Sequence, residues 1–311
     1  MKAALIVNPV ARGAGEAIAA VLAAGVRLGL EPPKILPTSA DHPGPAQARA
    51  ALASGVERLI VAGGDGTLRN VAGVVAAAGS PRCDTTMAIV PIGAGNLVAR
   101  NLGIQPRRLD KAADVALTGA PRQLSVGWVS CRVAGLWLPE VPMLVVAGIG
   151  RDAEAIATTR PWLKRRAGWL AYAESGGRQA LREAMPMSVG LDGEPPQALA
   201  AWSVLVAILP RLPMGVVAFP GVEPGTDIAQ VLRVDLASPL EWGAVALKGL
   251  THTTTPVKAL NYAPASTVFV EPAVPGPVQI DGDLIRDVEQ MRVRLQAKAI
   301  YVASPEKPGQ P

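Results

Sequence analysis

The sequence has few aromatic residues, cysteines and histidines, and each shortage argues against a class of function. Aromatic residues make up 4% of the 311-residue chain, so we do not expect recognition of nucleic-acid bases by stacked rings. The two cysteines, Cys83 and Cys131, are too few for a disulfide framework or a structural zinc site, and we expect both to be reduced and buried. Only two histidines are present, which argues against a histidine-based nucleophile or a zinc mechanism, and we expect His252 to be structural.

The sequence also lacks a long hydrophobic run. No stretch reaches the roughly 18 apolar residues that a membrane-spanning helix needs. The first predicted strand follows directly after Met1 and Lys2, so we expect no signal peptide and a cytoplasmic protein, either soluble or peripherally attached at the inner face of the membrane. The net charge of +5 suits an anionic ligand or membrane surface. The basic patches at residues 107–111 and 164–166 are open to two interpretations, membrane contact or a solvated helix face.

Half of the residues are hydrophobic, and a chain of this length favours two domains. Residues 1–122 alternate short apolar runs with helical patterns, which predicts an α/β lobe with a parallel sheet. From about residue 123 the pattern becomes strand-like, interrupted by one predicted helix at 168–185, which predicts a β-rich lobe over 123–295. Residues 296–303 are predicted to return as strand or helix, and 304–311 to form a disordered polar tail. The strands of the first lobe are predicted at 3–7, 34–36, 58–62 and 87–90, and those of the second at 124–129, 144–146, 202–209, 231–234 and 267–270.

A glycine-rich turn at residues 63–67 follows the apolar run at 59–62. Its glycines, Gly63, Gly64 and Gly66, are expected to take positive φ and to bring bare N–H groups close to phosphate oxygens. Asp65 is the only charge in the turn, and beside a nucleotide it would act through a bound cation or a water. Thr67 is predicted to cap the following helix. The alternative is an ordinary strand-to-helix turn in which Asp65 is merely a cap.

Two further predicted strands end in polar loops that contain glycine. The first loop holds Asn8, Pro9 and Arg12, and the second runs from Gly93 to Asn96. The carboxyl ends of parallel strands in an open sheet form one crevice. The three loops together therefore predict a shared site for an anion.

These loops resemble the nucleotide-binding motifs of the diacylglycerol kinase catalytic family, which includes bacterial lipid kinases and sphingosine kinases. The resemblance lies in Asn8-Pro9, in residues 63–67 and in residues 91–100, and it continues at 148–154 and 168–172. It is looser after about residue 175, where 279–283 match a late segment of the family. It implies an amino-terminal lobe like that of NAD kinase and phosphofructokinase, a β-rich, sandwich-like second lobe, and an active cleft between them. It also implies ATP, Mg²⁺ and a lipid substrate whose hydroxyl is phosphorylated, with diacylglycerol or a related lipid as acceptor.

The resemblance carries over to individual residues. Asp283 stands at the position of the family's catalytic base, where the family has glutamate. Asp65 is also expected to be a catalytic residue. We expect Asp65 and Asp152 to anchor Mg²⁺ and its waters. The residues expected to bind the nucleotide are Asn8, Pro9, Arg12, Thr38, Gly63, Gly64, Asp65, Gly66, Thr67, Gly93, Gly95 and Asn96.

Each acid of the second lobe also has a plainer interpretation. Asp152 would then be a surface helix start, and Asp283 part of a β-turn. The segment Asp192-Gly193-Glu194 is a rival to the one that ends at Asp283. Ala94 replaces a threonine that touches the nucleotide in many family members, which removes one hydroxyl contact.

Two other functions compete with a lipid kinase. One is a soluble-substrate kinase of the NAD kinase type, and the other is a non-catalytic sensor of nucleotide or lipid. A homodimer is left open. An apolar acceptor pocket is expected in the second half of the chain, built from Trp128, Trp137, Trp162, Trp169, Leu170 and Met214.

Overall fold

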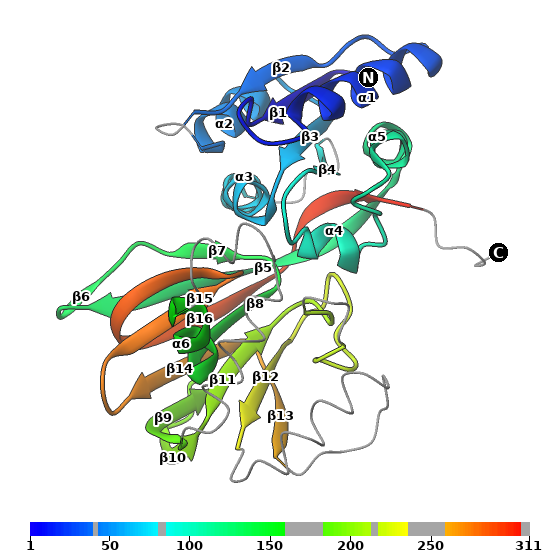
Figure 1. Ribbon diagram of the computed structural model, residues 1–311. Helices are drawn as coiled ribbons and strands as arrows, with labels where there is room; N and C mark the ends of the chain where they lie inside the picture. Colours follow the sequence, from blue (N-terminus) through cyan, green and yellow to red (C-terminus); the bar gives the residue numbers. More distant parts are fainter. Residues whose placement is uncertain (40–42, 80–84, 159–182, 213–216, 236–258, 306–311) are drawn as a thin grey trace. The chain divides into compact units, whose positions relative to one another are not determined.

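The structure is a computed structural model that describes residues 1–39, 43–79, 85–158, 183–212, 217–235 and 259–305. It divides into two compact units, residues 1–126 with 297–311 (unit 1) and residues 127–296 (unit 2). Two long strands, β5 (Ala120–Val133) and β16 (Asp283–Ser304), run through both units (Figure 1). The sequence-based boundaries lie at 122/123 and 295/296, within a few residues of these divisions.

Unit 1 is a parallel sheet with helices packed on it. Its strand order is β2-β1-β3-β4, and the last residues of β16 extend it beside β4. The strands β1, β3 and β4 are almost entirely buried, as expected for parallel strands covered on both faces. The bounds of the strands are β1 (Ala3–Val7), β2 (Lys34–Pro37), β3 (Arg58–Gly63) and β4 (Thr86–Pro91).

The helices of unit 1 bury small, apolar faces. Helix α1 packs against α5, and α2 packs against α3. Helix α1 buries Ala17, Val21 and Ala24, which recur at helical spacing. The bounds of the helices are α1 (Ala14–Arg27), α2 (Pro45–Ala53), α3 (Asp65–Ala77), α4 (Leu97–Asn101) and α5 (Leu109–Thr118).

Unit 2 is built from antiparallel strands around one hydrophobic cluster. One branch has the order β13-β12-β11-β8-β15, and a second joins β10, β9, β14, β16 and β5. Residues of both branches, such as Val206 and Val270, belong to the same buried cluster. The elements are β6 (Leu136–Trp137), β7 (Val141–Met143), β8 (Val146–Gly150), α6 (Arg151–Thr158), β9 (Met185–Leu191), β10 (Gln197–Ala201), β11 (Ser203–Ala207), β12 (Ala229–Val234), β13 (Leu260–Ala265), β14 (Thr267–Pro272) and β15 (Gly276–Ile280). The predicted α/β fold with a parallel core sheet and a second β-rich region is confirmed.

Several local predictions need correction. The strand expected at 144–146 is wrong, because β8 begins only at Val146 and the N–H groups of Leu144 and Val145 are bound by the Asp281 carboxylate instead of a neighbouring strand. For residues 296–303, where the sequence is compatible with both strand and helix, the structure shows strand. Ser304 is the buried last residue of β16 and not part of a tail. Met185 begins a strand and does not end a helix.

Some predictions fall on residues that the structure does not describe. They are the helix at 168–182, the basic patch at 164–166, the tail at 306–311, and Cys83, Trp162, Trp169, Leu170, Met214 and His252. Cys131 is free and buried, as predicted, and burial raises the pKa of its thiol to about 12. Among the described helices, none is long and apolar enough to cross a membrane.

Candidate functional site

The loops that follow β1, β3 and β4 start at the carboxyl ends of parallel strands, at the same edge of the sheet. After β1, Asn8 forms a turn in which its side-chain Oδ1 accepts the N–H of Val10 at 3.2 Å. Pro9 and Arg12 in this loop are exposed. Thr38, at the end of β2, is buried and donates its backbone N–H to the carbonyl of Val7 at 2.8 Å. The ends of β1 and β2 therefore lie beside each other, and the nucleotide-binding role of these residues stays a prediction.

The glycines of the 63–67 turn serve close packing and not unusual backbone dihedrals. Neither Gly63, Gly64 nor Gly66 has a positive φ, so that prediction is wrong. Gly64 has an extended φ of −94°, and a Cβ on Gly93 would overlap the Gly64 Cα. A Cβ on Gly63 would come within 3.0 Å of the Thr67 Cβ. The turn after β3 and the loop after β4 are therefore packed backbone against backbone.

Helix α3 begins at Asp65, and its N-cap is Gly64, with no side-chain cap. Thr67 therefore lies inside the first turn, and the prediction that it caps the helix is wrong. The interpretation of Asp65 as a cap of its own helix is also wrong. The Asp65 carboxylate instead reaches the start of α4, where its Oδ1 accepts the N–H of Val98 at 3.4 Å.

Burial raises the pKa of the Asp65 carboxyl, and backbone N–H groups of Val98, Leu97 and Asn96 offset part of that rise. Its Oδ2 is so close to the β4–α4 loop that a Cβ on Gly95 would lie 2.9 Å away. One carboxylate thus links the β3–α3 turn to the β4–α4 loop. This link was not foreseen from the sequence.

Asn96 closes the loop after β4. It has the left-handed φ of 51°, its Oδ1 accepts the N–H of Gly93 at 2.9 Å, and its Nδ2 donates to the carbonyl of Gly93 at 2.6 Å. Asparagine tolerates this backbone region better than most residues do. Ala94 and Gly95 are exposed in the same loop. The Asn96 amide therefore shapes the loop whose outer residues face solvent.

In unit 2, Asp152 lies in the first turn of α6, directly after β8. Its N–H donates to the Ser203 hydroxyl at 3.0 Å. Both carboxylate oxygens are buried, and neither has a hydrogen bond of good geometry to any described residue. Burial raises the pKa of this carboxyl to about 6, although the Ser203 hydroxyl, the Ala153 N–H and the Gln279 amide nearby offset part of the rise. Asp152 does start a helix, but its carboxylate does not lie on the surface.

We expect Asp152→Asn to stabilise the protein at neutral pH in the absence of ligands. A carboxyl whose pKa is raised from 3.8 to about 6 by folding destabilises the folded state when ionised, by about 3 kcal/mol above pH 6. The gain should vanish below about pH 4, grow between pH 4 and 6, and then stay constant. Urea unfolding with EDTA at several pH values measures this gain in the free energy of unfolding.

The control is Asp287→Asn, at an exposed position with φ of 56°, which should show no such gain. A variant no more stable than the wild type at pH 7.5 would contradict the burial argument.

The segment Asp281-Gly282-Asp283 is a two-residue hairpin turn between β15 and β16. Asp281 and Gly282 have φ of 50° and 90°, the pattern that favours Asp-Gly in such turns. The Asp281 carboxylate accepts the N–H groups of Leu144, Val145 and Val146 at 2.8 to 2.9 Å. Asp281 is therefore structural, whereas Asp283 is exposed at the start of β16.

The rival segment has the same construction. Asp192 and Gly193 have φ of 48° and 82°, and the Asp192 Oδ1 accepts the N–H groups of Ser266 and Thr267 at 2.8 and 2.9 Å. Asp192 also donates its N–H to the Thr267 carbonyl, as Asp281 does to that of Val146. The two turns thus share an Asp-Gly pair with positive φ and a carboxylate that accepts backbone N–H groups, and Glu194 follows its pair as Asp283 does. They differ in length, because residues 192–196 join β9 to β10, whereas β16 begins directly at Asp283.

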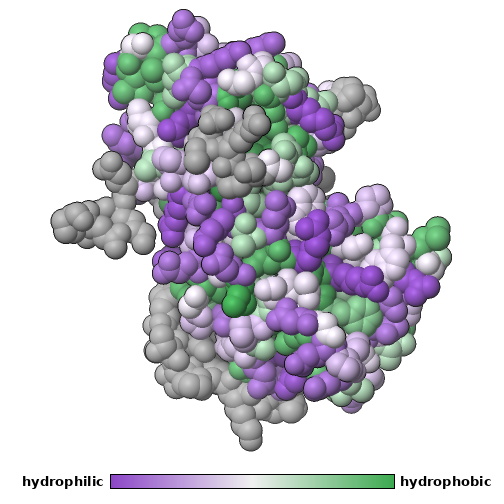
Figure 2. Space-filling model, turned by 180° about the vertical axis from the view of Figure 1, so that it is seen from behind, coloured by the Kyte–Doolittle hydropathy of each residue, from purple (hydrophilic) through white to green (hydrophobic). Residues whose placement is uncertain are grey.

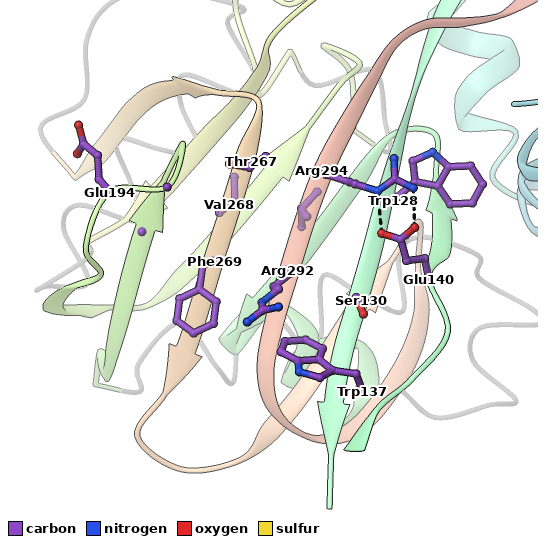
Figure 3. A pocket seen from close by; sticks show the side chains of 13 residues that line it. Trp128, Ser130, Trp137, Glu140, Glu194, Thr267, Val268, Phe269, Arg292 and Arg294 are labelled. Atoms are coloured by element: carbon purple, nitrogen blue, oxygen red, sulfur yellow. Dashed lines mark hydrogen bonds and ion pairs between the residues drawn. The ribbon is translucent and has the colours of Figure 1, made fainter. Parts of the chain in front are cut away.

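Glu194 belongs to a pocket that holds none of the residues predicted to bind the nucleotide or the metal or to act as the base (Figure 3). This cavity of about 370 Å³ is lined by side chains of β5, β14 and β16 and by the β9–β10 turn. The Arg292 guanidinium lies 4.2 Å from the ring centre of Trp137, and Arg294 pairs with Glu140. Trp128 and Trp137, two residues of the expected acceptor pocket, line it. The lining thus mixes aromatic rings with four charged side chains, of which Arg294 and Glu140 form an ion pair.

The predicted site residues therefore form two groups, each described in its own unit. Unit 1 links the loops after β3 and β4 through Asp65, and the loop after β1 starts at the same edge of the sheet. Unit 2 brings Asp152 near Gln279, which binds the turn that ends at Asp283. Among the described residues, no group of three or more acids, histidines or cysteines could hold a metal ion. Sequence reasoning also missed Gln279, a polar residue between the buried Val278 and Ile280. A polar residue within an otherwise apolar strand was the sequence feature that could have revealed it.

Comparisons with known proteins match the first part of the chain in sequence and nearly all of it in fold. Residues 2–129 match the family model of the diacylglycerol kinase catalytic domain. A diacylglycerol kinase of Bacillus subtilis (strain 168) is 32% identical over 114 residues, which cover 37% of this chain and 34% of that protein. A probable lipid kinase YegS-like of Pseudomonas aeruginosa (strain UCBPP-PA14) is 35% identical over 127 residues, 40% of this chain and 37% of that protein. The aligned segments thus span about a third of the length of these relatives.

The fold extends the likeness over the rest of the chain. The crystal structure of a putative diacylglycerol kinase from Bacillus anthracis str. Sterne has a TM-score of 0.75 at 20% identity and covers 98% of this chain and 95% of that chain. At this identity the match shows a shared fold. The sequence match to the diacylglycerol kinase catalytic domain itself covers residues 2–129.

Proposed function

We propose that this chain is a kinase that transfers the γ-phosphoryl group of ATP to a hydroxyl of a lipid, diacylglycerol or a related molecule. The observation that carries the proposal is the linked pair of loops in unit 1, in which Asp65 joins the β3–α3 turn to the start of α4. Backbone N–H groups at such loops and helix starts suit phosphate oxygens. The match of these residues to the family model supports the same conclusion.

The residues present fit a divalent cation. Asp152 offers two buried carboxylate oxygens that no described group binds, and such orphaned oxygens call for a cation or ordered waters. We assign the holding of Mg²⁺ and its waters to Asp152 and Asp65. When bound, Mg²⁺ would offset the charge on the phosphate oxygens.

Phosphoryl transfer is in line and needs an acceptor oxygen that has lost its proton. In the proposed step, Asp283 takes the proton of the lipid hydroxyl, and the hydroxyl oxygen forms a bond to the γ-phosphorus. The bond between that phosphorus and the β–γ bridging oxygen breaks, and ADP leaves. The exposed position of Asp283 leaves its carboxylate accessible to an acceptor.

A lipid acceptor implies work at a membrane surface, and we extend the proposal to peripheral contact at the cytoplasmic face. Leu136, Trp137 and Leu138 are consecutive exposed apolar residues, with 72% of Leu136 accessible. Tryptophan and leucine at such a position suit the interface of a bilayer. On the described part of the face in Figure 2, hydrophilic and hydrophobic side chains are otherwise mixed.

We expect incubation with γ-labelled ATP, Mg²⁺ and mixed lipids to give a labelled lipid. Parallel reactions with diacylglycerol alone, with NAD alone and without an acceptor separate a lipid kinase from a soluble-substrate kinase. Asp283 is one methylene shorter than the glutamate of the family, which keeps a sensor as the second candidate function. Tight binding of ATP without any labelled product would establish the sensor and overturn the kinase.

A further inference from the structure

Gln279 is a buried polar residue in the middle of an apolar strand. Only 4% of its surface is exposed, and its neighbours Val278 and Ile280 are buried in the core of unit 2. In β15 its backbone lies opposite Gly148 of β8 and Leu284 of β16. A buried amide must have hydrogen-bond partners, because an unsatisfied one costs about 1 to 3 kcal/mol.

One end of the Gln279 amide holds the turn that leads to Asp283. Its Oε1 accepts the N–H of Gly282 at 3.0 Å. This bond fixes which way the amide lies, because the opposite orientation would place an NH₂ group against the N–H of Gly282. The carbonyl end therefore faces the turn, and the NH₂ end points away from it.

The other end of the amide lies beside the Asp152 carboxylate. The two groups share the space above Gly148, where a Cβ would come within 3.0 Å of the Gln279 Nε2 and would overlap Asp152 Oδ2. Any side chain at position 148 would therefore separate them. The Gln279 amide is also among the groups that offset the rise in the pKa of Asp152.

We propose that Gln279 is a positioning residue that couples Asp152, on α6, to the turn that carries Asp283. The inference rests on the proposed function, which gives Asp152 and Asp283 their roles. Glutamine suits the task because its amide accepts at one end and donates at the other. A residue that only accepts hydrogen bonds would bind the N–H of Gly282 but repel the Asp152 carboxylate. An apolar residue would bind neither group.

A structural role alone would make a different prediction. If Gln279 only satisfied the Gly282 N–H, its replacement would cost stability without any dependence on Asp152. Coupling instead requires that the effects of Gln279 and Asp152 be non-additive. A double-mutant cycle separates the two possibilities.

The test uses Gln279→Met, Gln279→Glu, Asp152→Asn and the two double variants in the full chain. We expect Gln279→Met to lower kcat for the lipid about 30-fold with little change in the KM for ATP, because a turn displaced near 1 Å costs up to about 100-fold in rate. In the Asp152→Asn background the same change should lower kcat less than threefold. Gln279→Glu keeps the acceptor for Gly282 but adds a charge beside Asp152, so Asp152→Asn should partly rescue it.

The matched control is Gln290→Met, which removes one exposed bond to Glu271 and should leave kcat unchanged. Equal losses from Gln279→Met with and without Asp152→Asn would overturn the coupling. If the wild-type protein phosphorylates no lipid, the proposed function fails but the inference is still testable. The same cycle is then measured on the free energy of unfolding, where additivity of Gln279→Met and Asp152→Asn would overturn it. Gln279→Glu supplies the cycle if Gln279→Met does not fold.

Discussion

Replacement of Asp283 by asparagine is expected to lower kcat for lipid phosphorylation by about a thousandfold, while Glu194→Gln lowers it less than threefold. General-base catalysis contributes about 10² to 10⁴ in rate, and asparagine cannot take a proton. Both variants are neutral amides two residues after the aspartate of an Asp-Gly turn. The loss of a carboxylate in both places controls for the general effect of the substitution. The measurement is initial rates with labelled ATP at saturating lipid.

Asp283→Glu completes this test, because it restores the side-chain length that the family has at this position. We expect it to keep at least the wild-type kcat. Equal losses in Asp283→Asn and Glu194→Gln would show that neither acid is the base. A loss confined to Glu194→Gln would move the chemistry to the turn beside the pocket of Figure 3.

The likeness of the two Asp-Gly turns also determines which substitutions are valid controls. Alanine at Asp192 would look like a harmless change of the rival acid, yet its carboxylate accepts two backbone N–H groups. Removing it takes away the acceptor that holds the turn to Ser266 and Thr267, so a loss in this variant could come from a displaced turn and not from the acid itself. Glu194 is the better control, because its turn stays intact when its side chain is changed.

The strands of unit 1 could be predicted from the sequence because each is a short, continuous apolar segment. The strand at 3–7 matches β1, and the run at 58–62 falls one residue short of β3. Each is an apolar run that parallel packing buries on both faces. The error at 144–146 has the opposite origin, since the backbone N–H groups there are satisfied by a carboxylate 135 to 137 residues away.

Candidate site residues could be found from motifs, but their contacts could not. That Asp65 belongs to a site followed from the glycines around it. That its carboxylate reaches α4 depends on Gly64 and Gly93 packing face to face, a contact between two loops that spacing does not reveal. Gln279 was missed for the same reason, because its hydrogen-bond partner Gly282 and its neighbour Asp152 come from different elements.

Asp65→Ala and Asp65→Asn are both expected to abolish measurable turnover, yet they should differ in folding. Alanine removes the charge that would act on the cation and also the acceptor that holds the N–H of Val98. Asparagine removes the charge but can still offer an oxygen to the same N–H. Because burial raises the pKa of Asp65, its ionised form costs folding free energy above the unfolded pKa near 3.9. At pH 7.5 the asparagine variant should therefore be at least as stable as the wild type, and the alanine variant less stable than the asparagine one.

Thermal unfolding and ATP-binding calorimetry with Mg²⁺ separate the two roles of this carboxylate. If Asp65 acts on the cation, asparagine should fold normally, lose turnover by more than about a thousandfold and bind magnesium-ATP more weakly. Turnover within tenfold of wild type in Asp65→Asn, with a large loss only in Asp65→Ala, would limit Asp65 to joining the two loops. The Mg²⁺ role would then have to pass to Asp152, whose buried oxygens have no hydrogen-bond partner among the described residues.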